Sequence, residues 1–250
     1  MTTTAETRTR KVNLIDTNVL LDEMGHKGSV SALENILGNP KNHVSKYAVN
    51  EMMNIYRSKD DEIMNLFNGH RRQIIDAPAI FKSRLERDCS AINGLYDRSP
   101  EMISEVAREH YISAQSDSEH ANAMFEYCYG MLLESSDHAL YQPKANHNER
   151  SFALDLAQMS SLISYAANES RKGNRVKVSF DTNDCDWEQV LCVMDHLDGD
   201  AYFDNRGTAD DEIVGYISSA LAEMSLPRQE FYEKQAAPYE NNVVSARLAV

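Results

Sequence analysis

The chain has 250 residues and a formal net charge of −14, with 39 acidic against 25 basic side chains. This length suits one large domain or one domain with an insertion. The chain lacks the run of about 18 apolar residues that a transmembrane helix needs, so we expect no membrane association. The four cysteines show no Cys-x-x-Cys spacing, which argues against a structural zinc site and favours a reduced, cytoplasmic protein.

The first regular pattern covers residues 11–21. A mostly apolar run ends on Asp16, and Thr17 and Asn18 separate it from further apolar positions. This pattern predicts a short buried strand, a turn and a helix. Because ligands bind beyond the carboxyl ends of the strands in open α/β sheets, Asp16 is well placed to hold a metal ion.

Further carboxylates follow in segments of similar form. A short strand near residue 43 runs into a helix, and Glu51 lies in the first turn of that helix. Asp155 lies near the start of an amphipathic helix. Three closely spaced aspartates then follow an alternating strand: Asp181, Asp184 and Asp186.

The alternation of strands and helices predicts an α/β fold with a central, mostly parallel sheet and right-handed crossovers. The middle of the chain reads as almost wholly helical and is too long for a plain connection, so we interpret it as a large helical insertion. The predicted order is a disordered leader (1–10), a first α/β half (11–75), the insertion (76–149), a second α/β half (150–205), and a C-terminal helix with a tail (206–250).

Four of these segments together resemble the PIN-domain nucleases. That family has a first strand ending in Asp-Thr-Asn, a Glu opening a later helix, an Asp early in another helix, and a strand followed by Thr-x-Asp. The matching residues here are Asp16-Thr17-Asn18, Glu51, Asp155 and Thr182-Asn183-Asp184. The match covers about residues 11–75 and 150–205 and implies a PIN-like three-layer α/β/α fold.

The resemblance also implies a carboxylate-bound Mg²⁺ or Mn²⁺ site, and both ions prefer hard oxygen ligands. Asp16 would be the central ligand, and Glu51 and Asp155 would complete the shell. Asp184 would hold a second ion. These four residues are therefore the candidate catalytic set.

Two of these assignments have rivals in the sequence. Asp181 and Asp186 can substitute for Asp184 or act as outer metal ligands. Asp137 competes with Asp155, because the separation between Asp155 and Asp184 is longer than the family usually shows. The sequence leaves both choices open.

Substrate contacts are expected from polar and basic residues. Asn18 or Thr182 would orient a ligand or a phosphate by hydrogen bonding. The stretch from residue 70 to residue 87 carries five basic side chains against two acidic ones. Arg71 and Arg72 in this stretch would contact phosphates, although a solvated helix face explains the same composition.

The function that the resemblance implies is metal-dependent hydrolysis of phosphodiester bonds in single-stranded or loop RNA, by an endoribonuclease. A structure-specific DNA nuclease is an alternative within the same class. A non-catalytic PIN-like module that binds RNA or a protein is an alternative from another class, and the strong negative charge favours it. Fold-level analogy leaves a homodimer or an inhibitor protein open as partner.

Overall fold

A computed structural model describes residues 9–25, 28–75, 98–138, 149–182 and 211–225 of the chain. Two candidate metal ligands, Asp184 and Asp186, lie outside the described residues. Among the helices within these ranges, none has the length and apolar content needed to cross a membrane.

Within the described ranges, the centre of the molecule is a sheet of five strands in which every pair of neighbouring strands is parallel. Its strands are β1 (Thr9–Ile15), β2 (Asn42–Ser45), β3 (Ile74–Ile75), β4 (Arg175–Asp181) and β5 (Met224–Ser225). The spatial order is β3-β2-β1-β4-β5, so β1 lies in the middle. The predicted α/β fold with a central parallel sheet is thereby confirmed. β1 takes in Thr9 and Arg10, the last two residues of the segment expected as a leader.

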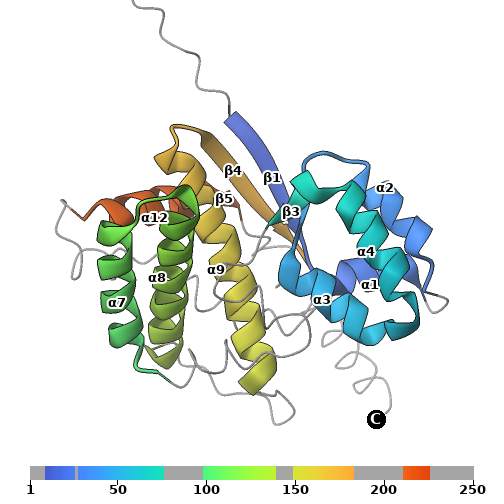
Figure 1. Ribbon diagram of the computed structural model, residues 1–250, viewed down its shortest axis with the longest axis horizontal. Coiled ribbons are helices and arrows are strands. Elements are labelled where there is room, and N and C mark those ends of the chain that lie inside the picture. Colours follow the sequence, from blue (N-terminus) through green and yellow to red (C-terminus); the bar gives the residue numbers. More distant parts are fainter. Residues whose placement is uncertain (1–8, 26–27, 76–97, 139–148, 183–210, 226–250) are drawn as a thin grey trace, which may run out of the picture.

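Helices cover the sheet from two sides, as the ribbon in Figure 1 shows. One layer contains α1 (Thr17–Met24), α2 (Leu33–Leu37), α3 (Lys46–Ile55) and α4 (Asp60–Gly69), with short 3₁₀ helices at Val30–Ala32, Arg57–Lys59 and Arg71–Gln73. The other layer contains α7 (Pro100–Ser113), α8 (Asp117–His138), α9 (Glu149–Arg171) and α12 (Glu212–Ala222). The two layers lie on the right and on the left of the sheet in Figure 1.

Side-chain alternation along the strands divides the apolar residues between the two layers. Val12 and Leu14 of β1 belong to the larger buried cluster, together with Val178 and Phe180 of β4 and the inner faces of α7, α8, α9 and α12. Ile15, one residue further along β1, belongs to the smaller cluster with α1–α4. The sheet therefore has a separate hydrophobic core on each face.

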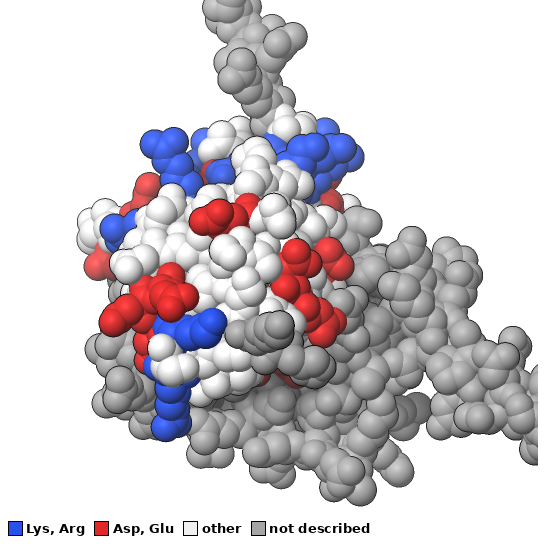
Figure 2. Space-filling view, turned by 90° about the vertical axis from the view of Figure 1, so that its right-hand side faces the viewer, with Lys and Arg blue, Asp and Glu red and all other residues white. Residues whose placement is uncertain are grey.

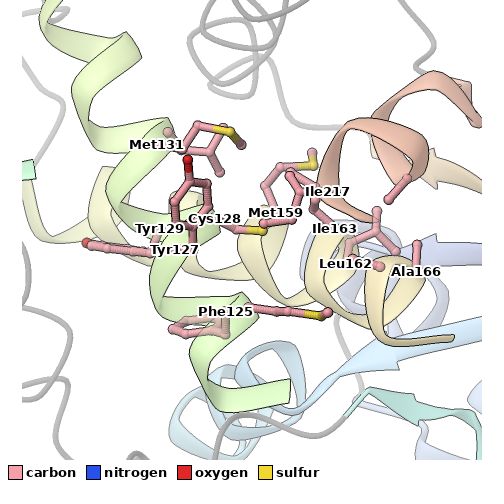
Figure 3. Close-up of a cluster of buried hydrophobic side chains, with 14 of the residues drawn as sticks. Phe125, Tyr127, Cys128, Tyr129, Met131, Met159, Leu162, Ile163, Ala166 and Ile217 are labelled. Atoms are coloured by element: carbon pink, nitrogen blue, oxygen red, sulfur yellow. The ribbon is translucent and has the colours of Figure 1, made fainter. Parts of the chain in front are cut away.

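The larger core is densest where α8, α9 and α12 meet. Figure 3 shows Cys128 and Met131 of α8 directed toward Met159 and Ile163 of α9, with Ile217 of α12 on the far side. All five side chains are fully buried. Burial raises the pKa of the Cys128 thiol, because an apolar environment disfavours the thiolate. Cys128 is therefore a packing residue.

The segment expected as a helical insertion contributes two described helices, α7 and α8. α7 packs along α8, and α8 packs along α9. α7 and α8 approach each other closely at Gly130, where an added Cβ would lie 2.7 Å from the Ser104 Oγ and 3.1 Å from the Pro100 carbonyl oxygen. The apolar faces of these helices share one core with β1 and β4.

Candidate site at the carboxyl edge of the sheet

The order of the strands reverses at β1, because later strands are added first on one side of it and then on the other. The chain passes from β1 to β2 and β3 on one side, and returns to β4 and then β5 on the other side. In open α/β sheets, ligands bind outside the carboxyl ends of the strands where the order reverses in this way. That position lies here between the ends of β1 and β4, which are followed by Asp16 and Thr182.

Asp16 is a buried carboxylate with partners on both oxygens. Its side chain is only 2% exposed. Its Oδ1 accepts a hydrogen bond of 2.7 Å from the backbone N–H of Thr17, and its Oδ2 accepts one of 2.8 Å from the Thr182 hydroxyl. Asp16 is also the N-cap of α1, so the positive end of the helix dipole favours its charge. These contacts fix the orientation of the carboxylate and stabilise it away from bulk water.

The register of β4 brings Thr182, and not Asp181, to this carboxylate. Asp181 pairs with Ile15 across the parallel ladder, and paired residues point to the same face of a sheet. The Asp181 side chain is exposed, whereas its backbone oxygen accepts a 2.9 Å hydrogen bond from the Asp16 N–H. Asp181 therefore holds the backbone of Asp16 in place.

Asp155 lies above the same edge, on α9. This helix precedes β4 and runs antiparallel to the strands, so its N-terminal part extends beyond their carboxyl ends, at the bottom of Figure 1. Gln158 shows which part of α9 is level with the carboxyl ends of the strands, because its Oε1 accepts a 3.1 Å hydrogen bond from the hydroxyl of Ser45, the last residue of β2. Asp155 comes three residues earlier on the same helical face and is half-buried. It therefore lies about 5 Å further out, beyond the sheet edge.

Glu51 lies in the second turn of α3 and not in the first turn as predicted, because the helix begins at Lys46. α3 contacts both α1 and α9. Glu51 follows Tyr47 by four residues and Ala48 by three, so it shares a helical face with both. Tyr47 belongs to the larger core, and Ala48 to the smaller core beside α1. The Glu51 side chain is nevertheless exposed, so it lies at the surface of α3 where the two helical layers meet.

The remaining candidates are distributed differently. Asn18, in the first turn of α1, is half-buried next to Asp16 in the chain. Arg71 and Arg72 are exposed on the 3₁₀ helix that precedes β3. Asp137 lies near the C-terminal end of α8. Among the side chains in the described ranges, no group of three or more His, Cys, Asp or Glu residues is close enough to hold a metal ion.

Sequence reasoning missed the link between Ser45 and Gln158. Ser45 is the N-cap of α3, and its hydroxyl accepts a 3.1 Å hydrogen bond from the Ala48 N–H as well as donating to Gln158. A serine between a strand and a helix is a recognisable capping signal. The position of Gln158 has no such signal, since it depends on how α9 crosses the sheet.

Comparison with known proteins gives no relative on which to base an assignment. No family model, no curated protein and no solved structure matches the chain.

Proposed function

We propose that the protein is a PIN-like, Mg²⁺- or Mn²⁺-dependent nuclease that hydrolyses phosphodiester bonds in single-stranded or loop RNA. The observation that carries the proposal is the buried carboxylate of Asp16 at the switch point of the sheet, oriented by Thr17 and Thr182. Glu51 and Asp155 support it, because they lie on the two helices that flank this edge.

The donor chemistry at this edge fits a divalent cation. Asp16, Glu51 and Asp155 offer hard carboxylate oxygens, and Thr182 offers a hydroxyl, but these three carboxylates do not lie close enough together to form one metal site by themselves. A full ligand set would need a further carboxylate beside Asp16, because the described residues contain no group of three. We assign that role to Asp184 or Asp186, which follow β4 in the sequence. A bound Mg²⁺ or Mn²⁺ would supply Lewis-acid activation of water and neutralisation of phosphate charge.

The protein's own residues would perform the positioning. Asp16 is held rigidly, so it would present the same geometry in the presence and absence of substrate. Thr182 keeps the Asp16 carboxylate in one orientation. Asn18 lies at the N-terminus of α1, where backbone N–H groups and a side-chain amide are suited to a phosphate oxygen. RNA is the favoured substrate by resemblance, and DNA is the comparison substrate in the test.

The test is cleavage of a fluorescently labelled single-stranded RNA, and of a DNA of the same sequence for comparison, by the full chain with Mn²⁺ and with EDTA. Asp16→Asn is the decisive variant, since asparagine retains the capping oxygen but removes the charge. Asp61→Asn, at an exposed position in the first turn of α4, is the matched control. We expect Mn²⁺-dependent cleavage that Asp16→Asn abolishes and Asp61→Asn retains. Equal cleavage by both variants would eliminate the proposal.

A non-catalytic PIN-like module that binds RNA or protein is the second candidate. The net charge of −14 and the lack of a three-residue ligand group among the described side chains favour it. The same experiment distinguishes the two functions. RNA binding by the parent chain without any Mn²⁺-dependent cleavage of RNA or DNA would support the module.

A further inference from the structure

A groove of about 820 Å³ lies within the smaller layer, between α3, α4 and the segment leading into β3. Its two walls repeat the same helical spacing. Lys46, Asn50 and Asn54 follow one another along α3, and Met64 and Asn68 do so along α4. The buried side chains of Val49 and Phe67 also line it. The groove is therefore an elongated channel with an apolar floor and polar rims.

The charge of the groove is opposite to that of the chain. Three cations line it, Lys46, Arg57 and Arg71, against one anion, Asp60. The ion pairs of the described residues all lie elsewhere. Figure 2 shows that acidic groups are scattered over the face formed by this layer, while most of its visible Lys and Arg gather along the upper rim. A cationic channel in a protein of net charge −14 favours a polyanion as ligand.

Asp60 distinguishes between the possible polyanions. Its Oδ1 is buried and has no hydrogen-bond partner in the described part of the chain. A buried carboxylate oxygen without a donor is costly, so a donor is expected when a ligand fills the groove. Nucleic-acid bases carry exocyclic amino groups that donate to carboxylates. An acidic peptide would instead bring further carboxylates against Asp60.

One end of the groove is anchored by hydrogen bonds, and the other end lies near the candidate catalytic edge. Gln73 donates from its Nε2 to the carbonyl oxygens of Leu37 and Asn42, at 2.9 and 2.8 Å, and so fixes the 3₁₀ helix that carries Arg71. At the other end, Lys46 directly follows β2, whose Val44 pairs with Ile15 of β1. Ser45 is therefore level with Asp16, and Lys46 opens α3 one residue beyond that level.

We propose that this groove is the binding channel for single-stranded nucleic acid, in which Lys46, Arg57 and Arg71 contact phosphates and Asp60 accepts a hydrogen bond from a base amino group. The proposal deepens the nuclease function and rests on it for the direction in which the strand continues, toward Asp16. Binding itself needs no metal. It can therefore be measured separately from cleavage.

The test is fluorescence anisotropy of a labelled oligoribonucleotide of about ten nucleotides with the full chain in EDTA. Three phosphate contacts predict a slope of log affinity against log salt of about −2, or about 20-fold weaker binding at about 200 mM than at about 50 mM salt. Arg71→Ala should reduce the slope by about 0.7. Lys41→Ala, at an exposed position before β2, is the control that should leave the slope unchanged. Thermal unfolding of each variant checks the fold.

Each outcome has a defined meaning. If Lys46→Ala, Arg57→Ala and Arg71→Ala all bind RNA with the affinity and salt slope of the wild type, the proposal that this groove binds nucleic acid is wrong. Mn²⁺-dependent cleavage by the same variants would still support the nuclease function. Groove-dependent binding without cleavage would support the groove and refute the nuclease. Competition by poly-glutamate as strong as that by RNA would overturn the assignment to nucleic acid.

A second variant tests the role of Asp60. If its carboxylate accepts from a base amino group, the wild type should bind cytidine-rich RNA more tightly than uridine-rich RNA, because cytosine carries the N4 amino donor. Asp60→Ala should bring the ratio of the two affinities to about one. An unchanged ratio would show that Asp60 does not contact the base.

Discussion

The two helical layers of this protein differ in what they bury and in what they present. The layer of α7, α8, α9 and α12 packs a wide apolar cluster that includes stacked rings, with the centroids of Phe125 and Tyr129 6.2 Å apart. The layer of α1–α4 has a smaller core, and a groove with polar rims opens between α3 and α4. The larger core on one face of the sheet buries most of the apolar side chains. The layer on the other face carries polar groups near the sheet edge. This division suggests that stability and function can be perturbed separately.

The largest expected losses of stability come from one matched pair of phenylalanines. Phe125 is 0% exposed in the larger core, and Phe67 is 1% exposed beneath the groove. Phe125→Ala should lower the free energy of unfolding by about 4 kcal/mol, because the surrounding helices cannot collapse into the cavity. Phe67→Ala should cost about 3 kcal/mol, since Met64, 40% exposed, can move into the space. Urea unfolding followed by circular dichroism measures both, and a larger loss for Phe67→Ala would contradict the comparison.

A pair of helical glycines gives effects of opposite sign. At Gly130 an added methyl would contact Ser104 and the backbone of Pro100, whereas at Gly215 in α12 it would meet no atom within 4 Å. Gly130→Ala should therefore destabilise the contact between α7 and α8 by about 2 kcal/mol. Gly215→Ala should stabilise the protein by up to about 1 kcal/mol through helix propensity alone. Thermal unfolding of the two variants decides the matter, and stabilisation by both would mean that α7 is not packed closely on α8.

The sequence predicted those features that depend on neighbouring residues. The strand that ends before Asp16 and the helix after it were predicted because the change of periodicity is local, but the helix begins directly at Thr17 without the expected turn. The parallel sheet followed from the alternation of strands and helices. β5 was not predicted, since the two residues Met224–Ser225 are too short to show a period. The expected strand at residues 200–203 lies outside the described residues.

Features that join distant segments could not be predicted in this way. The hydrogen bond from Thr182 to Asp16 spans 166 residues and depends on the register of β1 against β4. A shift of one residue would bring Asp181 to the same place, which is why the sequence left both candidates open. The residues that line the groove recur every four positions along α3 and α4, which the sequence shows. The width of the groove depends on how the two helices pack, which the sequence does not show.

Acid should destabilise the protein through a histidine in the middle of the sheet. His43 on β2 is 1% exposed, its Nδ1 donates to the Lys41 carbonyl oxygen, and its Nε2 accepts from Arg10 at 3.1 Å. Burial lowers the pKa of His43 below its ordinary value of 6.5, and the charge of Arg10 lowers it further against the raising effect of the Lys41 carbonyl. The folded protein therefore keeps the neutral ring after the unfolded chain has begun to take up a proton.

The sign of the pH effect follows from this difference. Above about pH 6.5 His43 adds no pH dependence, and below it stability falls by up to about 1.4 kcal/mol per pH unit until the pKa of the folded state is reached. His43→Gln should remove this part of the slope. Urea midpoints of the wild type and the variant at about pH 7.5 and 5.5 test the expectation. If the wild type and His43→Gln lose the same amount of stability between these two pH values, the pH dependence comes from other titratable groups.

The smallest expected effect on stability lies at Asp16, where the effect on metal response should be large. Asparagine caps helices as well as aspartate does, so Asp16→Asn should change the free energy of unfolding by less than about 0.5 kcal/mol in EDTA. Asp16→Ala should cost about 1 kcal/mol, because the N–H of Thr17 loses its acceptor. Mn²⁺ at 100 times its dissociation constant should stabilise the wild type by about 2.7 kcal/mol, and this gain should vanish in both variants. An equal Mn²⁺-induced gain in stability of Asp16→Asn would show that the cation does not bind at Asp16.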